Sequence, residues 1–236
     1  MNRALVVFSG GQDSCTCLGY ALCKYDEVYT VGFSYGQRHR VELDCRKVFL
    51  SKLREEFPKW DEKLKNDKLI DISYLKDLTD SALTDETQKS IEQTENNLPS
   101  SFVPGRNLIF LANASAYAYT IGADTLITGV GEADYSGYPD CREKTMQAMQ
   151  QALSLGLERD ITIETPLMHL SKARTWELAE QAGGSRLVDL IVKESHTCYF
   201  GDRSIFHPWG FGCGQCPACI LRQKGYEEYM LSRSRR

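Results

Sequence analysis

The chain has 236 residues, 42% of them hydrophobic, and a formal net charge of −4, which suits one sizeable core with a small appended module. The acidic balance counts against broad nucleic-acid binding, and the basic tail at residues 233–236 is expected to be solvated. Because no apolar run is long enough for a signal peptide or a membrane span, we expect a cytoplasmic protein with no membrane partner.

The N-terminal segment predicts a strand, a tight turn and a helix. An apolar run at residues 4–8 is followed by Ser9-Gly10-Gly11-Gln12-Asp13-Ser14 and then by a helical stretch at 15–22. Two glycines allow a close approach to a ligand, and the first helical turn offers N–H groups at the positive end of its dipole. The segment therefore predicts a phosphate-binding loop, with Asp13 beside the phosphates or a metal ion. The alternative is an ordinary turn in which Asp13 or Ser14 caps the helix.

The next stretch predicts alternating strands and helices, which is typical of a parallel α/β sheet. Strands are expected at 27–33 and 68–72, with a helix from 41 to a stop at Pro58. Ligands of such sheets gather outside the carboxyl ends of the strands, so residues 34–40 are candidates for an adenosine pocket. Residues 76–101 are polar and aperiodic, and either a lid over the predicted phosphate-binding site or plain disorder fits them.

Arg106 begins the next predicted helix, which follows Phe102-Val103-Pro104-Gly105 and ends near Gly122. An arginine there opposes the helix dipole, so a phosphate or carboxylate facing it would explain its position. A surface arginine paired with a nearby acid is the alternative.

A fourth strand at 125–130 precedes a polar stretch that suits a substrate loop. Asp140 and Glu143 have capping-box spacing for a helix starting near Cys141, which would be a structural reason for both. Asp134 and Arg142 are stronger substrate candidates, because an arginine can bind a planar carboxylate through two hydrogen bonds.

A fifth strand at 161–164 leads to Ser171, a natural N-cap for a helix from Lys172 to Ala182, with Gly183-Gly184 as its stop. Lys172 in the first turn is electrostatically misplaced, as Arg106 is. A bound phosphate would account for it, and an ordinary surface lysine fits equally well on chemistry alone.

Nine cysteines in an expected cytoplasmic protein predict buried thiols or metal ligands. Four of them lie near the C-terminus: Cys198, Cys213, Cys216 and Cys219. They can surround one tetrahedral Zn²⁺ as a structural site. An iron–sulfur run would place another cysteine at position 223, where this chain has glutamine.

The whole set of motifs is more specific than any one of them. In order, these are Ser-Gly-Gly-Gln-Asp-Ser, Phe-Val-Pro-Gly-Arg-Asn, Tyr-Pro-Asp-Cys-Arg, Thr-Pro-Leu-x-x-Leu-Ser-Lys and Glu-Ser-His-Thr-Cys-Tyr with the trailing cysteines. The set resembles the QueC/ExsB family of queuosine biosynthesis, which belongs to the PP-loop ATP pyrophosphatases. The resemblance covers nearly the full chain and is weakest between Lys76 and Ser101.

The resemblance implies a fold and a reaction. The fold would be a doubly wound, mostly parallel α/β sheet with helices on both faces, Rossmann-like and similar to adenine nucleotide alpha hydrolases. An ATP-binding domain at 1–190 and a C-terminal zinc-binding region at 191–236 would divide the chain. The reaction would convert 7-carboxy-7-deazaguanine, ammonia and ATP, with Mg²⁺, into the nitrile 7-cyano-7-deazaguanine (preQ0). A homodimer is compatible with the sequence.

The resemblance also implies site residues. Asp13, Lys172 and Arg106 would be catalytic, and Cys198, Cys213, Cys216 and Cys219 match the zinc ligands one by one. ATP would be bound by Lys172 and the loop region: Phe8, Ser9, Gly10, Gly11, Gln12, Asp13, Ser14, Cys15, Thr16, Cys17 and Leu18. The deazaguanine substrate would be bound by Arg106, Asn107, Asp134, Asp140 and Arg142.

Two other classes stay open. One is another PP-loop adenylating enzyme, either an amide-forming synthetase or a tRNA-modifying thiolase. A thiolase would be expected to carry Cys-x-x-Cys near its active-site loops, and no such pair lies before Cys198. The other is a zinc-knuckle module that binds nucleic acid, which the acidic balance disfavours.

Overall fold

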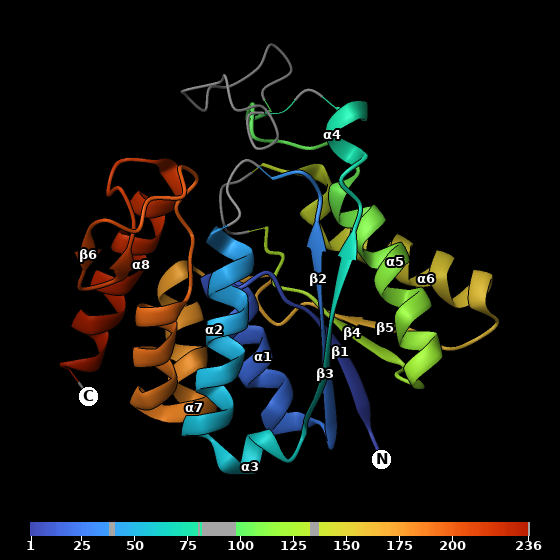
Figure 1. Cartoon of the computed structure of the whole chain (residues 1–236), viewed down its shortest axis with the longest axis horizontal. Helices are drawn as coiled ribbons and strands as arrows, with labels where there is room; N and C mark the ends of the chain where they lie inside the picture. Colours follow the sequence, from blue (N-terminus) through green and yellow to red (C-terminus); the bar gives the residue numbers. More distant parts are fainter. Residues whose placement is uncertain (38–40, 80, 82–97, 133–136, 236) are drawn as a thin grey trace.

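The protein is built on a five-stranded parallel sheet with the order β3-β2-β1-β4-β5 (Figure 1). The computed structural model describes residues 1–37, 41–79, 81, 98–132 and 137–235. Its strands are β1 (Arg3–Val7), β2 (Glu27–Ser34), β3 (Leu64–Asp71), β4 (Thr125–Ile127) and β5 (Thr162–Glu164). The chain starts in the middle of the sheet, moves outward to β3 and then crosses to β4. The strand order therefore reverses beside β1, where a ligand crevice is expected.

Helices cover both faces of this sheet (Figure 1). On one face lie α1 (Gln12–Lys24), α2 (Val41–Glu56) and α7 (Lys172–Glu194), and on the other lie α5 (Arg106–Ile121) and α6 (Glu143–Leu157). Alternate residues of β1 supply the two cores: Ala4 and Val6 belong to the first, and Leu5 belongs to the second. The doubly wound architecture predicted from the sequence is confirmed.

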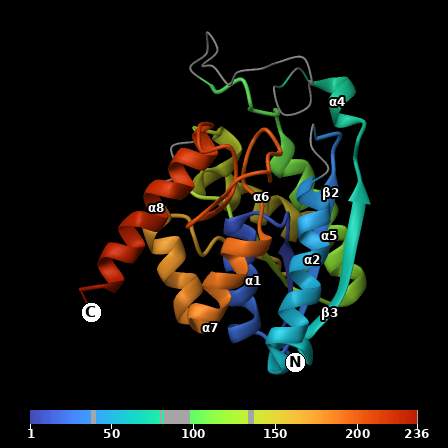
Figure 2. The ribbon, with the colours of Figure 1, turned by 60° about the vertical axis from the view of Figure 1, so that its left-hand side comes forward.

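The C-terminal part packs against the first of these faces. Two short strands, β6 (Phe206–His207) and β7 (Gly210–Phe211), pair antiparallel and lead to α8 (Pro217–Arg233). Figure 2 shows α8 running beside α7, and the two helices meet through Trp176 of α7 and Tyr226 of α8, whose ring centroids are 5.2 Å apart. None of the described helices is long and apolar enough to cross a membrane.

The predicted elements are present, with several changes of boundary. Strand β4, predicted at 125–130, ends at Ile127. Strand β3 begins at Leu64, before the predicted 68–72, because an edge strand can be polar and exposed over most of its length. Pro58 ends α2 and also opens the short helix α3 (Pro58–Asp61). Gly184, at φ 68° and ψ −169°, interrupts α7, and a second helical segment follows directly where a stop was predicted. Two further short helices are α4 (Leu75–Leu78) and the 3₁₀ turn Pro139–Cys141.

A buried arginine fixes the carboxyl end of β1. Arg46 of α2 is 1% exposed, donates to the Phe8 carbonyl at 2.8 Å and forms a two-point ion pair with Asp67 of β3. Its guanidinium lies over β2 at Gly32, where a Cβ would come within 2.5 Å of Arg46 Nε. One side chain thus ties three strands together directly beneath the loop that follows Phe8.

Candidate active site and metal centre

A cavity of about 830 Å³ opens at the carboxyl ends of β1, β2 and β4. The residues around it come from segments far apart in the sequence. Those predicted as site residues are Ser9, Gly11, Gln12, Asp13, Ser14, Arg106, Asn107 and Lys172. The tertiary structure therefore brings the candidate phosphate loop, the start of α5 and the start of α7 to one place.

The loop from Ser9 to Ser14 is held by its own hydroxyl groups. Ser14 Oγ accepts the Ser9 and Gly10 amide N–H groups at 3.2 and 3.1 Å and donates to the Gly11 carbonyl at 3.0 Å. Gly10 has φ 93°, and a Cβ there would lie 3.0 Å from the Arg46 backbone, so only glycine suits this turn. Helix α1 has Gly11 as its N-cap, with no side-chain cap. The capping alternative for Asp13 and Ser14 is therefore wrong.

The remaining predicted ATP-binding residues lie behind this loop. Phe8, Cys15, Cys17 and Leu18 are fully buried in the core beneath it. Thr16 is also fully buried, and its hydroxyl donates to the Gln12 carbonyl at 3.1 Å. Together with Gly10, these residues do not line the cavity. They shape the loop and the first turns of α1.

Lys172 and Asp13 form an ion pair at the cavity wall. Lys172 Nζ lies 2.9 and 2.8 Å from the two Asp13 carboxylate oxygens, and the Lys172 side chain is only 8% exposed. Ser171 is the N-cap of α7, as predicted, and accepts the Arg174 amide at 3.4 Å. The unfavourable positive charge of Lys172 at this helix start is thus offset by the carboxylate of Asp13, which lies 159 residues earlier in the chain.

Arg106 begins α5 between two tyrosine rings. Its guanidinium carbon lies 5.6 Å from the Tyr35 ring centroid and 5.8 Å from that of Tyr138, distances at which cation–π attraction acts. Burial raises the pKa of Tyr35 to about 12. The Tyr35 phenol therefore presents a polar, neutral hydroxyl at neutral pH. Arg106 is placed to meet an anionic group in the cavity.

Asp140 caps a different helix from the one the sequence indicated. Its carboxylate accepts the Asn107 amide at 3.0 Å and so satisfies a donor in the first turn of α5. The amide of Glu143 is accepted by Glu132 at 3.0 Å, and the N-cap of α6 is Arg142, with no side-chain cap. The predicted capping box of Asp140 and Glu143 is therefore wrong, because a contact between α5 and the 3₁₀ turn replaces it.

The substrate candidates after β4 do not all reach the cavity. Asn107 lines it and donates to Cys141 Sγ at 3.3 Å. Arg142 is exposed and does not line the cavity. Asp134 lies outside the described residues, as do residues 38–40 of the candidate adenosine pocket and most of the predicted lid at 76–101.

Several cavity residues were not singled out by the sequence reasoning. Glu42, at the start of α2, lines the cavity, and burial raises its pKa while the Ser9 hydroxyl and the charge of Arg106 oppose that rise. Tyr138, whose hydroxyl lies 2.6 Å from that of Ser101, and His196 also line it. Tyr138 and His196 occur inside the quoted motifs, which was the available signal.

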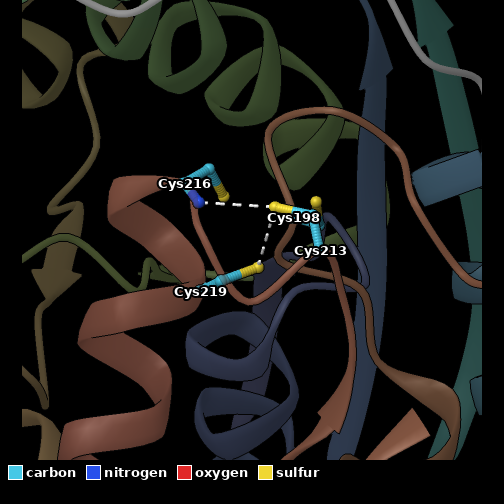
Figure 3. A group of neighbouring side chains, drawn as sticks. All are labelled: Cys198, Cys213, Cys216 and Cys219. Atoms are coloured by element: carbon cyan, nitrogen blue, oxygen red, sulfur yellow. Dashed lines mark hydrogen bonds between the residues drawn. The ribbon is translucent and has the colours of Figure 1, made fainter. Parts of the chain in front are cut away.

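Four cysteines form a compact cluster beside this cavity. Cys198 and Cys213 come from the segment before α8, Cys216 caps that helix, and Cys219 lies in its first turn (Figure 3). Their four sulfur atoms all lie within 4.8 Å of one another, and Cys213 Sγ is 3.9 Å from Cys219 Sγ. Gly212 allows this approach, since a Cβ there would lie 2.6 Å from Cys219 Sγ.

The donor set suits zinc. A tetrahedron with Zn–S bonds of about 2.3 Å has S···S edges of about 3.8 Å, close to the separation observed. Hydrogen bonds from Cys216 and Cys219 lower the pKa of Cys198 strongly, and donating to Cys198 raises the pKa of Cys216 to about 11. One thiolate is thus favoured without a metal, whereas a divalent cation would stabilise four.

A fully buried arginine connects this cluster to the core. Arg222 of α8 donates to the Trp209 carbonyl at 2.7 Å and to the Ser195 and Thr197 hydroxyls at 3.0 and 2.9 Å. His196, which lies between Ser195 and Thr197, donates its amide N–H to the Gly10 carbonyl at 3.1 Å. The metal-binding segment is therefore attached directly to the phosphate-loop turn.

The fold and the site define a nucleotide-binding α/β protein with a candidate phosphate loop at its topological switch point and a four-cysteine metal site. A family model described as "Queuosine biosynthesis protein QueC" matches residues 3–230, so the chain belongs to that family. The resemblance predicted from the motifs is confirmed.

Named relatives agree with this assignment. The chain is 55% identical, over 237 aligned positions, to the 7-cyano-7-deazaguanine synthase of Leptothrix cholodnii, covering 99% of this chain and 100% of that protein. It is 55% identical to the enzyme of that name from Paraburkholderia phytofirmans, covering 96% of this chain and 92% of that protein.

A solved structure of similar fold is a 4-thiouridine synthetase in complex with RNA and ATP, at 18% identity and a TM-score of 0.50. The match covers 97% of this chain and 53% of that one, so the chain spans about half of that protein. At this identity the likeness supports the fold alone.

Proposed function

We propose that this protein synthesises 7-cyano-7-deazaguanine from 7-carboxy-7-deazaguanine, ammonia and ATP, in the cytoplasm and for queuosine biosynthesis. The observation that carries the proposal is the convergence of the Ser9–Ser14 loop, the Lys172–Asp13 pair and Arg106 on one cavity of about 830 Å³. The 55% identity to 7-cyano-7-deazaguanine synthases over nearly the full chain supports the choice of substrate.

The reaction proceeds in two adenylations. A carboxylate oxygen of the substrate attacks the α-phosphorus of ATP, and pyrophosphate leaves. Ammonia then attacks the acyl carbon, the C–O bond to AMP breaks, and the nitrogen loses one proton to give the amide. The amide oxygen attacks a second ATP and pyrophosphate leaves again. Loss of AMP and of the two nitrogen-bound protons then yields the nitrile.

The side chains act by position and charge. The Ser9–Ser14 loop and the start of α1 hold the departing pyrophosphate, and Lys172 neutralises phosphate charge when ATP displaces its contact with Asp13. Arg106 holds the substrate carboxylate or the α-phosphate. Asn107 contributes to the substrate pocket, and Asp140 fixes its position by capping α5. Asp134 and Arg142 are the other substrate candidates. Mg²⁺ bound with ATP would neutralise phosphate charge, and Asp13 is the loop carboxylate that would hold it.

Cys198, Cys213, Cys216 and Cys219 hold one structural Zn²⁺ within a C-terminal region that begins near residue 191, after an ATP-binding domain at 1–190. All four positions of a tetrahedron are then filled by protein, which leaves no open coordination site for catalysis. The ion would keep the start of α8 against the cavity, since Ala218, Leu221 and Lys224 of that helix line it.

Mass spectrometry of the product tests the proposal. Purified protein is incubated with 7-carboxy-7-deazaguanine, Mg-ATP and ammonium. We expect the nitrile, with two AMP released per molecule of product. Accumulation of the amide alone would indicate an amide-forming synthetase, and absence of AMP would exclude adenylation.

A further inference from the structure

Two buried polar residues of the cavity lining carry side-chain atoms that have no hydrogen-bond partner among the described residues. They are Gln12, 2% exposed, whose amide nitrogen and oxygen both lack a partner, and His196, 4% exposed, whose Nδ1 lacks one. A buried donor or acceptor left unpaired destabilises the folded protein. Groups of this kind at a cavity wall indicate a ligand that pairs with them.

The hydrogen bonds of His196 determine which hydrogen-bonding groups a ligand at this site must carry. His196 Nε2 lies 3.1 Å from the Cys198 carbonyl oxygen, and a carbonyl can only accept, so Nε2 carries the proton. Nδ1 is then an acceptor. Gln12 offers a second acceptor in Oε1 and a donor in Nε2. Two unmet acceptors require a ligand with N–H or O–H donors, and an ionised phosphate has none.

Both side chains lie at the turn of the phosphate loop. The His196 amide donates to the Gly10 carbonyl at 3.1 Å, and the His196 carbonyl lies 3.4 Å from where a Gly11 Cβ would be. Gln12 is the next residue of the loop. In the proposed reaction the acyl carbon and the α-phosphorus meet beside this turn, so the nucleophile that attacks the acyl carbon must bind here.

We propose that the Gln12 carboxamide and His196 Nδ1 bind the ammonia that attacks the adenylated substrate, an inference that rests on the proposed function. Ammonia presents three N–H donors on one atom, so it can donate to both acceptors and keep its lone pair free to attack. The Gln12 carboxamide is uncharged, so it favours ammonia over ammonium, whose burial would need a negative charge. The N–H groups of the deazaguanine pyrimidine ring lie on the opposite side of the bicycle from the carboxyl group. They cannot reach this turn while that carboxyl group is being adenylated beside it.

The test separates adenylation from amidation in the Gln12→Met variant. Adenylation is measured without ammonium, as substrate-dependent exchange of labelled pyrophosphate into ATP. Amidation is measured as product formation against ammonium concentration at saturating ATP and acid. We expect the KM for ammonium to increase by a factor at least ten times larger than the factor by which the exchange rate decreases. Gln12→Leu is the second variant if Gln12→Met is insoluble, and Gln147→Met, on the exposed face of α6, is the matched control.

Two results would overturn the inference. An unchanged KM for ammonium would mean that the Gln12 side chain does not bind ammonia. An exchange rate that falls as far as the KM for ammonium rises would assign the side chain to ATP or to the acid. Failure of the proposed function is a separate result, because the unmodified protein would then give no nitrile.

Discussion

Gly225 of α8 determines how closely this helix approaches Lys172. A Cβ at Gly225 would lie 2.6 Å from both Cβ and Cγ of Lys172 and 2.9 Å from its backbone carbonyl carbon. These separations are well inside van der Waals contact, so a Gly225→Ala substitution must displace Lys172 or the start of α7. Lys172 would then lose its contacts of 2.8 and 2.9 Å with Asp13.

The magnitude follows from two opposing effects. Alanine in place of glycine inside a helix gains about 1 kcal/mol, and overpacking costs about 1–3 kcal/mol. The net loss of stability is then about 0–2 kcal/mol, which shifts the melting temperature by a few degrees in a chain of this size. Because the strain falls on Lys172, we expect kcat/KM for ATP to fall at least tenfold, about 1.4 kcal/mol of lost transition-state stabilisation.

Steady-state kinetics with varied ATP, thermal unfolding and zinc analysis measure these effects together. Gly156→Ala is the matched control, because a Cβ there meets nothing within 4 Å and Gly156 lies in α6, away from the cavity. The control should gain stability and keep its activity. A Gly225→Ala variant with unchanged kcat/KM for ATP would refute the reasoning.

Three further substitutions test other parts of the site. Asp13→Ala should abolish AMP formation while zinc stays bound, and persistent ATP turnover would contradict the loop assignment. Cys216→Ala should give zinc-poor or insoluble protein, so full zinc occupancy would argue against the four-cysteine site. Asp140→Ala should lower the free energy of unfolding by about 0.5–2 kcal/mol, as loss of a helix cap does. Asp140→Asn keeps the acceptor and should lose less, and equal losses in urea unfolding would show that Asp140 does not act as a cap.

The sequence alone was sufficient for features that depend on neighbouring residues. Local periodicity predicts the order of strands and helices. The pair Gly10-Gly11 predicts a tight turn, and Gly10 has a φ of 93° there, which only glycine adopts readily. The cysteine cluster can also be predicted from the sequence, because three of its ligands lie within seven residues and a tetrahedral ion imposes that spacing. Ser171 could be identified as a helix cap because its partner is three residues away.

Only the tertiary structure determined which distant residues pair. Asp13 meets Lys172 across 159 residues, and Asp140 caps α5 across 33 residues although its nearer spacing favoured α6. Nothing in local periodicity marks Arg46 or Arg222 as fully buried, because an arginine on a helix is usually exposed. Their burial depends on carbonyl and hydroxyl acceptors that converge only when strands and helices pack. Gly225 likewise looks like any helical glycine until α8 lies against Lys172.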